Sequence, residues 1–251
     1  MAEFSRKIVV VTGAGSGIGR ATALAFAREG ATVVVAGRGA GPLDETVRLV
    51  EADGSTATAV AADVSQAADV ARLIATVVER HGGLDIAFNN AGVVAAGPLA
   101  DMDDEAWDRL VATNLTGVYL SMKHEITHMR ANGGGVIVNT ASNLGAHMRL
   151  PFLSAYAASK AAVSALTRAA AREYIADGVR INAVSPGPTD TAMSLRPGET
   201  EAGRTERMKE ALPIGRVGSL DEAASAVLWL ASPESGFTVG HDLVIDGGAS
   251  A

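Results

Sequence analysis

The stretch Ile8-Val9-Val10-Val11-Thr12-Gly13-Ala14-Gly15-Ser16-Gly17-Ile18-Gly19 decides the fold expected for this chain of 251 residues. Its first four residues are β-branched and apolar, which predicts a buried strand. The glycine-rich turn that follows lets backbone N–H groups approach a pyrophosphate at the start of a helix. The pattern is T-G-x-x-x-G-x-G rather than G-x-G-x-x-G, because Ile18 stands where the third glycine would fall. We expect a dinucleotide at this turn, bound by Gly13, Ser16, Gly17, Ile18 and Gly19.

Short apolar runs alternate with helix-length amphipathic stretches along the whole chain. The expected strands are Lys7–Thr12, Thr32–Ala36, Thr56–Ala61, Leu84–Phe88, Gly135–Ala141, Arg180–Val184 and Leu243–Ile245. The expected helices include Ile18–Glu29, Ala67–His81, Asp104–Arg130, Ala155–Ala176 and Glu222–Ala231, the last opened by a capping box at Ser219. Alternation of this kind predicts an α/β fold. We expect one doubly wound Rossmann-type domain spanning 1–251, with a seven-stranded parallel sheet and helices on both faces.

The segment 186–218 interrupts this alternation. It carries four prolines, Pro186, Pro188, Pro197 and Pro213, together with mixed charges. A long connection without regular structure in a compact domain is usually a functional loop or a disordered one. We expect it to contain a substrate lid.

Composition excludes several classes of protein. The chain has 21 Lys and Arg against 28 Asp and Glu, a formal net charge of −7, which argues against a nucleic-acid partner. No stretch has the roughly 18 to 20 apolar residues of a membrane span. There are no cysteines, and the five histidines lack metal-ligand spacing, so we expect neither disulfides nor a metal site. A cytoplasmic enzyme fits these features.

The second expected strand ends with Gly37 and Arg38. Sites that prefer NAD usually carry an acidic residue at this point, which bonds the ribose hydroxyls of the adenosine. Gly37 leaves that place open, and Arg38 can pair with a 2′-phosphate. We expect NADP(H) to be preferred, with NAD(H) possible, although Arg38 could also be an ordinary charge on a solvated loop.

Two further groups follow strands at their carboxyl ends, where open α/β sheets bind ligands. Asp63 and Val64 follow the third expected strand, and Asn89-Asn90-Ala91-Gly92 follows the fourth. We therefore expect Asp63, Val64, Asn90, Ala91 and Gly92 to contact the cofactor.

Residues of a reacting centre stand later in the chain. Tyr156 and Lys160 are four apart in a helical stretch, so they share one helix face. A neighbouring ammonium favours the phenolate, and we expect Lys160 to lower the pKa of Tyr156 toward a catalytic range. Ser142, at the end of the fifth expected strand, can donate a hydrogen bond to a substrate carbonyl. Asn114 lies inside an expected helix, where asparagine is unfavourable.

Together these motifs resemble the short-chain dehydrogenase/reductase family in its compact, single-domain form. The resemblance runs nearly end to end, and it includes Pro186-Gly187, Pro213-Ile214-Gly215-Arg216 and Asp246-Gly247-Gly248. Seven motifs in the family's order carry it, although each is weak alone. One departure is the separation of 14 residues between Ser142 and Tyr156, one more than is commonest, which makes analogy for the substrate pocket less secure.

The resemblance implies a role for each matching residue. Tyr156 would be the general acid in carbonyl reduction and the base in alcohol oxidation, while Lys160 would also hold the nicotinamide ribose. Ser142 would orient the carbonyl, and Asn114 would support a water-mediated proton relay. In the cofactor site, Asn90 and Ala91 would lie near the ribose and Asp63-Val64 near the adenine. The remaining expected cofactor contacts are Pro186, Gly187, Thr189 and Thr191.

The loops near this centre suggest a small-molecule substrate. Expected pocket residues are Val94, Leu144, His147, Leu150 and Met193, a mostly apolar set that suits a neutral ketone or secondary alcohol. His147 could equally be a solvated loop residue.

We expect a carbonyl reductase or alcohol dehydrogenase that forms homotetramers, as family members commonly do. One alternative is a 3-oxoacyl-carrier-protein reductase. Such enzymes hold the carrier with basic residues, expected near Gly133 and Asp177, and neither residue is basic. A non-catalytic NADP-binding redox sensor is the alternative from another class. The complete set of Ser142, Tyr156 and Lys160 argues against it.

Overall fold

The computed structural model describes residues 3–196 and 198–251, so Pro197, within the expected lid, lies outside the described residues. Seven parallel strands form one sheet in the order β3-β2-β1-β4-β5-β6-β7. Their bounds are β1 Ile8–Thr12, β2 Thr32–Gly37, β3 Ala57–Ala61, β4 Ile86–Asn89, β5 Gly135–Thr140, β6 Val179–Pro186 and β7 Asp242–Ile245. Every predicted strand is present within two residues of its expected limits. The strand order reverses between β1 and β4, the point at which doubly wound sheets bind ligands.

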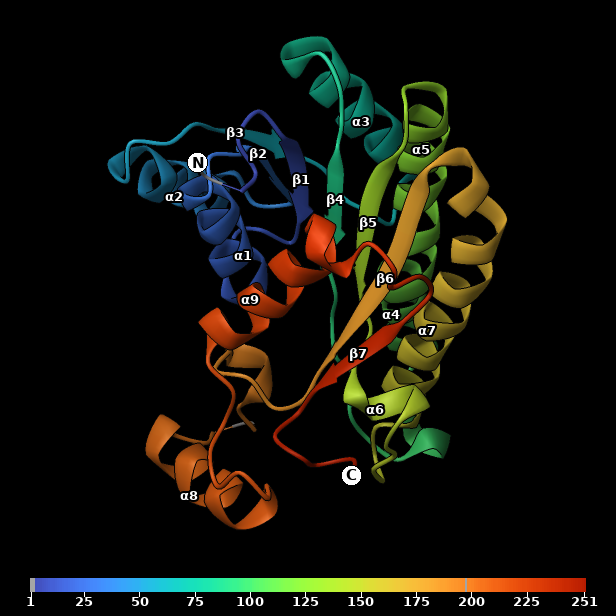
Figure 1. The fold of residues 1–251 in the computed structure, drawn as a ribbon. Helices are drawn as coiled ribbons and strands as arrows, with labels where there is room; N and C mark the ends of the chain where they lie inside the picture. Colours follow the sequence, from blue (N-terminus) through green and yellow to red (C-terminus); the bar gives the residue numbers. More distant parts are fainter. Residues whose placement is uncertain (1–2, 197) are drawn as a thin grey trace.

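Helices cover both faces of the sheet, as predicted (Figure 1). One face carries α1 Gly17–Arg28, α2 Ala40–Ala52 and α9 Leu220–Ala231, and the other carries α3 Ala67–His81, α4 Asp104–Val111, α5 Gly117–Ala131 and α7 Ser154–Tyr174. The remaining helices are α6 Asn143–Ala146 and α8 Glu201–Ala211, with short 3-10 turns at Leu99–Asp101, Ile175–Asp177, Ala192–Ser194 and Pro233–Ser235. The predicted capping box at Ser219 is confirmed, since its hydroxyl accepts from Glu222 N and the Glu222 carboxylate accepts from Ser219 N.

Strand alternation explains why the protein has two cores. Along β1, the Val10 side chain packs with α3, α5 and α7, whereas Val9 and Val11 pack with α1, α2 and α9. Phe26 of α1 is fully buried in the second core, where its ring meets that of Phe4 edge-on at 4.9 Å. Burial of such a side chain contributes about 1.5–3 kcal/mol. The sheet is therefore held firmly on both faces, which makes its carboxyl edge a rigid base for a site.

Two predictions about helices were wrong. The stretch 104–130 is not one helix, because a π-helical turn at Ala112–Thr116 separates α4 from α5. The segment 186–218 is not devoid of regular structure, since it contains α8 and a 3-10 turn. Its α8 stands beyond the carboxyl ends of the strands, away from the sheet (Figure 1). Few of its residues are apolar, so the sequence carries no periodic signal for it.

Candidate active site

The glycine-rich turn between β1 and α1 is closed by contacts that only glycine permits. Gly13 and Gly17 have φ of +66° and +52°, which side chains other than glycine's rarely adopt. A Cβ on Gly19 would lie 2.4 Å from Gly13 O. The first N–H groups of α1 therefore face a space that no side chain fills, with exposed Ser16 preceding the helix without capping it. Such a cradle fits the pyrophosphate of a dinucleotide.

Two residues that sequence reasoning missed hold this turn in place. Thr46 of α2 is buried, and its hydroxyl donates to Ala14 O at 2.9 Å. Arg20 of α1 donates to Thr46 Oγ1 and to the carbonyl of Gly15. Neither contact had a signal in the sequence, because the partners come from different helices.

The turn also packs against the end of β4. Thr12 Oγ1 accepts hydrogen bonds from the N–H groups of Asn90 and Ala91, at 3.0 and 3.1 Å. The Asn90 amide donates to Thr12 O at 3.1 Å. A small crevice beside them includes Val64 and Ala91 in its lining. Val64, Asn90 and Ala91 thus lie together with the turn, as the prediction that they bind one cofactor requires.

The ends of β2 and β3 lie next to each other at the same edge. The backbone N–H of Ala62 donates to Gly37 O at 2.9 Å, which brings Arg38 and Asp63 onto neighbouring loops. Arg38 is exposed. The Asp63 carboxylate accepts from the N–H and hydroxyl of Ser65, at 2.9 and 2.8 Å. Arg38 is free to meet a ligand, whereas the Asp63 side chain shapes its own turn.

The expected catalytic side chains come from the end of β5 and from α7. Ser142 and Lys160 are buried, and the Ser142 hydroxyl accepts from Leu144 N at 3.1 Å, so its hydrogen remains available. Lys160 Nζ donates to Thr140 O at 2.7 Å. Burial lowers the pKa of Lys160 to about 8. The Ser142 hydroxyl and the Lys160 ammonium therefore lie in buried surroundings, and half-buried Tyr156 lies one helical turn before Lys160 on α7.

The prediction that Lys160 lowers the pKa of Tyr156 is corrected for the chain alone. Burial raises the pKa of Tyr156, and the group that opposes this rise is the Ser142 hydroxyl. Lys160 points to the Thr140 carbonyl instead, and its own charge is destabilised by burial. The phenol is accordingly neutral at neutral pH, the form that can donate a proton.

The Asn114 side chain is occupied by a neighbouring loop. It lies in the π-helical turn, fully buried, and bonds both backbone groups of Val93, accepting from N at 2.8 Å and donating to O at 2.9 Å. Its amide also donates to Ser159 Oγ at 3.2 Å. A Cβ on Gly92 would lie 3.4 Å from Asn114 Oδ1 and 3.5 Å from Lys160 Nζ. Asn114 therefore holds the loop after β4 beside Lys160.

The loop after β6 runs back to the glycine-rich turn. A Cβ on Gly187 would lie 2.6 Å from Asp246 Cβ, so the chain passes close to the C-terminal segment there. Thr189 is buried and donates from its hydroxyl to Gly187 O at 3.0 Å. Thr191 lies over the turn, because its Cγ2 would be 3.3 Å from a Cβ on Gly17. Pro186 ends β6 at the same edge.

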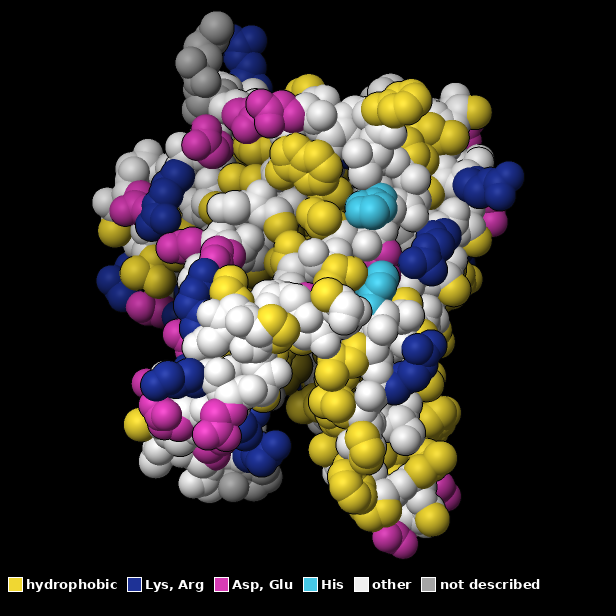
Figure 2. Space-filling model, turned by 60° about the horizontal axis from the view of Figure 1, so that its bottom comes forward, with side chains coloured by type: hydrophobic (Ala, Val, Ile, Leu, Met, Phe, Trp, Pro, Cys, Tyr) yellow, Lys and Arg dark blue, Asp and Glu magenta, His cyan; other side chains and the backbone are white. Residues whose placement is uncertain are grey.

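An open cleft lies between two lobes at this edge (Figure 2). One lobe is the lid region, with mixed charges, and the other is rich in hydrophobic side chains. Three large apolar residues of the expected pocket are exposed, namely Val94, Leu150 and Met193, while Leu144 is half-buried. The loops 93–98 and 147–153 are joined by Gly97 N, which donates to Phe152 O at 2.8 Å.

His147, predicted to line the pocket, has one ring nitrogen bound within the protein. Its Nε2 lies 2.9 Å from Oδ2 of Asp242, a buried carboxylate at the start of β7. The same oxygen accepts from the Ser164 hydroxyl. The ring is thus directed to β7 by a residue 95 positions away, which no local pattern could indicate.

Across residues 3–196 and 198–251, no group of three or more His, Cys, Asp or Glu could hold a metal ion. No helix in the described part of the chain is both long and apolar enough to cross a bilayer.

The fold and site define a nucleotide-binding α/β enzyme, and comparison with known proteins names its family. A family model described as enoyl-(acyl carrier protein) reductase matches residues 13–250. The chain is 42% identical over 250 residues to cis-4-hydroxycyclohexanecarboxylate dehydrogenase of Sinomonas cyclohexanicum, covering 99% of this chain and 98% of that one. It is 37% identical to cyclohexanol dehydrogenase of Acinetobacter sp. strain SE19, covering 98% and 95% of the two chains.

Solved structures agree with these relatives. The crystal structure of levodione reductase superimposes with a TM-score of 0.93 at 35% identity, covering 98% of each chain. The chain belongs to the short-chain dehydrogenase/reductase family. It is an oxidoreductase that interconverts alcohol and carbonyl groups with a nicotinamide cofactor.

Proposed function

We propose that this enzyme is an NADP(H)-preferring reductase of small ketones, or dehydrogenase of the matching secondary alcohols, with Ser142, Tyr156 and Lys160 as its catalytic residues. The observation that carries the proposal is that the Ser142 hydroxyl lies at the Tyr156 phenol and that Lys160 Nζ lies beside Gly92, in the loop that packs on the glycine cradle. The nicotinamide, when bound, supplies the hydride for reduction and accepts it in oxidation. The family resemblance adds Asn114 as a proton relay, although its amide is occupied by Val93.

The proton chemistry follows from the environment of the three groups. Burial raises the pKa of Tyr156, so its phenol keeps the proton that carbonyl reduction requires. Ser142 accepts from Leu144 N and can donate its own hydrogen to the substrate oxygen, which orients and polarises the carbonyl. In alcohol oxidation the same groups act in reverse, and the phenol must first lose its proton.

Lys160 has two tasks in this proposal. One of its three N–H groups is bonded to Thr140 O, and two remain for the hydroxyls of the nicotinamide ribose. Its pKa of about 8 means that the ammonium is charged at neutral pH. The charge then stabilises a phenolate on Tyr156 as the proton leaves.

Preference for NADP(H) is supported by the ends of β2 and β3. Arg38 is exposed beside Gly37 and can pair with a 2′-phosphate, while a carboxylate at position 37 would repel it. NAD(H) remains usable, because nothing at Gly37 blocks the ribose. The other proposed cofactor contacts are Gly13, Ser16, Gly17, Ile18, Gly19, Asp63, Val64, Asn90, Ala91, Gly92, Pro186, Gly187, Thr189 and Thr191.

The substrate class we propose is a six-membered cyclic ketone or alcohol. Val94, Leu150 and Met193 offer exposed apolar surface for it, and Leu144 is half-buried. Two relatives of the chain are named for substituted or simple cyclohexanols. An apolar ring contacts such a wall without leaving a polar group unpaired.

A carrier-bound 3-oxoacyl substrate is the second candidate, supported by the acyl-carrier description of the matching family. The lack of basic residues at Gly133 and Asp177 does not argue against this substrate within one chain. Gly135 N donates to Gly178 O, so both positions lie at the amino ends of β5 and β6, opposite Ser142. A redox sensor lacking turnover is disfavoured, because a sensor has no use for the catalytic trio.

We also propose a homotetramer. The described part of α5 and α7 presents a shallow groove whose lining includes Tyr119, Met122, Ile126, Leu166 and Tyr174. Tyr119 is 49% exposed, an unusual environment for an aromatic side chain on a helix. Light scattering of the purified protein tests this assembly, and a monomeric mass would contradict it.

The function is tested by supplying NADPH, and separately NADH, with cyclohexanones, acyclic ketones and an acetoacetyl-carrier substrate. Loss of reduced-cofactor absorbance is the readout. We expect faster turnover with NADPH and with the cyclic ketones. Faster turnover of the carrier substrate would favour the second candidate. Cofactor binding without turnover of any ketone, or of alcohols with oxidised cofactor, would favour the sensor.

A further inference from the structure

Arg204 is a buried cation in the middle of an otherwise exposed helix. It lies on α8, and only 5% of its surface is exposed. A buried guanidinium is costly unless acceptors surround it. Its partners therefore indicate what α8 is built to hold.

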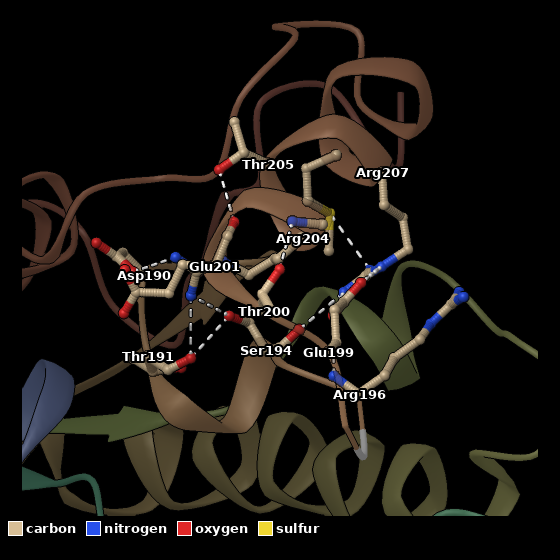
Figure 3. A network of polar contacts seen from close by, with 12 residues as sticks. Asp190, Thr191, Ser194, Arg196, Glu199, Thr200, Glu201, Arg204, Thr205 and Arg207 are labelled. Carbon is tan, nitrogen blue, oxygen red and sulfur yellow. Dashed lines mark hydrogen bonds and ion pairs between the residues drawn. The ribbon is translucent and has the colours of Figure 1, made fainter.

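Those partners all lie on the loop that follows β6 (Figure 3). Arg204 Nη2 donates to Asp190 Oδ1 at 2.5 Å, and Nη1 donates to Thr191 O at 3.3 Å and to Ser194 Oγ at 3.1 Å. The contact with Thr191 is to its backbone, so it fixes where that residue lies whatever its side chain does. Arg204 thus bonds to three residues of one loop.

The opposite side of the same loop is anchored to the start of α9. Asp190 N donates to Gly218 O and Gly218 N donates to Pro188 O, both at 2.9 Å. The segment 188–191 is therefore held between Gly218 and Arg204. Thr191, at its end, lies against Gly17 of the glycine cradle.

We propose that Arg204 is a positioning residue that couples the lid to the cofactor, by holding Thr191 over the Gly17 turn. Binding of the dinucleotide between this turn and Thr191 then favours the arrangement in which α8 is docked through Arg204. The inference deepens the proposed function and rests on it. Arg204 itself touches no expected substrate or cofactor atom.

A second arginine of α8 provides a matched control. Arg207 donates to both carboxylate oxygens of Glu199, at 2.7 and 2.6 Å, and to Ser194 O at 3.0 Å. It reaches neither Asp190 nor Thr191 (Figure 3). Its loss removes an ion pair of the same kind from the same helix while leaving the segment 188–191 anchored.

The test measures NADPH binding to the full chain by nicotinamide fluorescence. We expect R204M to raise the dissociation constant for NADPH about tenfold. A change of this size corresponds to the free energy of about one charge-assisted hydrogen bond. R204K, which keeps the charge but loses the planar fork of the guanidinium, should recover part of this loss. R207M should stay within about threefold of wild type, because Arg204 and Gly218 still hold the segment 188–191.

A second readout separates coupling from simple loss of structure. A protease that cleaves after glutamate has sites at Glu199, Glu201, Glu206 and Glu210 of the lid region. We expect NADPH to slow this cleavage in wild type and R207M but not in R204M. If R204M does not fold, D190N carries the test, because the Asp190 side chain is 58% exposed.

The outcomes distinguish the two proposals. If wild type binds neither NADPH nor NADH, the proposed function fails and this inference fails with it. If wild type binds and R204M binds equally well with full protection, only the positioning role of Arg204 is overturned. Weaker binding and lost protection in R204M, with both kept in R207M, support it.

Discussion

The two walls of the cleft are built from different contacts. The β5–α7 wall places Ser142 and Lys160 in buried surroundings, with bonds to backbone groups of neighbouring elements. The lid wall stands away from the sheet, and ion pairs from Arg204 and Arg207 hold it. Ion pairs across a mobile surface dissociate more readily than a buried core opens. The proposed chemistry thus lies on the wall with the buried side chains, opposite a wall held by ion pairs.

If the rigid wall carries the chemistry, loss of one phenolic oxygen there should abolish most turnover. Y156F is expected to reduce kcat/KM by about 10²- to 10⁴-fold, the usual contribution of a general acid. Cofactor affinity should stay near wild type, because the Lys160 contacts remain. Steady-state kinetics and fluorescence titration measure the two quantities.

Y174F, at the far end of the same helix, is the control and should leave both values unchanged. Activity of Y156F within tenfold of wild type would remove Tyr156 from its proposed role.

The glycine cradle between β1 and α1 stands on the same sheet as the rigid wall. Its close contacts should not tolerate an added methyl group. In G19A the new Cβ would lie 2.4 Å from Gly13 O and 2.6 Å from Asn90 Nδ2, so the backbone must shift. We expect a loss of about 1–3 kcal/mol of unfolding free energy together with cofactor binding. Urea denaturation and NADPH titration measure both.

G41A is the matched control, since a Cβ at Gly41 of α2 meets nothing within 4 Å. Its stability should equal or slightly exceed that of wild type. Wild-type affinity in G19A would contradict the cradle.

Beneath the rigid wall, Glu125 of α5 is fully buried and accepts from Asn89 Nδ2 at 2.9 Å. Burial raises its pKa from 4.5 to about 8. A raised pKa means that the folded state binds a proton that the unfolded state has lost, so stability should fall from about pH 4.5 up to about pH 8.

E125Q removes this titration. We expect it to be more stable than wild type by about 1–3 kcal/mol at pH 8 and little different at pH 4.5. Urea denaturation at both pH values measures the slope. Equal pH slopes in the two proteins would show that Glu125 does not titrate in this range.

The preference for NADPH over NADH should depend on the exposed loop after β2, which carries Arg38, rather than on the rigid wall. R38D replaces the proposed partner of the 2′-phosphate with a repelling charge. We expect the NADPH-to-NADH ratio of kcat/KM to fall by about tenfold or more, while turnover at saturating NADH is retained. An unchanged ratio would assign Arg38 to ordinary surface charge.

At the rim of the cleft, Phe152 combines a φ of +67° with a ring that is 61% exposed. F152G relieves the backbone strain of the folded state but increases the conformational entropy of the unfolded chain. The two effects oppose each other, so the free energy of unfolding should change by less than about 1 kcal/mol. KM for cyclohexanones should rise a few-fold if the ring contacts them.

F152A keeps the strained Cβ while losing the ring, so it separates the two effects. An unchanged KM in both variants would place Phe152 outside the substrate site.

A feature of the site could be predicted from the sequence when the residues that form it are close along the chain, and not when they are far apart. The cradle glycines and the Tyr156–Lys160 pair are local patterns, and their geometry follows from a turn and from helix periodicity. Asn114, in the π-helical turn, bonds to Val93, and His147 bonds to Asp242. Neither partner leaves a trace in the local sequence, so these contacts could not be predicted.

The sequence by itself determined the order of strands and helices, the glycine cradle and the helix face shared by Tyr156 and Lys160. These follow from residue periodicity and from the absence of a side chain in glycine. The tertiary structure alone decided that burial raises the pKa of Tyr156 and lowers that of Lys160. It also decided that Arg204 donates hydrogen bonds to the loop that lies over the cradle. Both depend on desolvation and on contacts between distant segments, which exist only once the chain has packed.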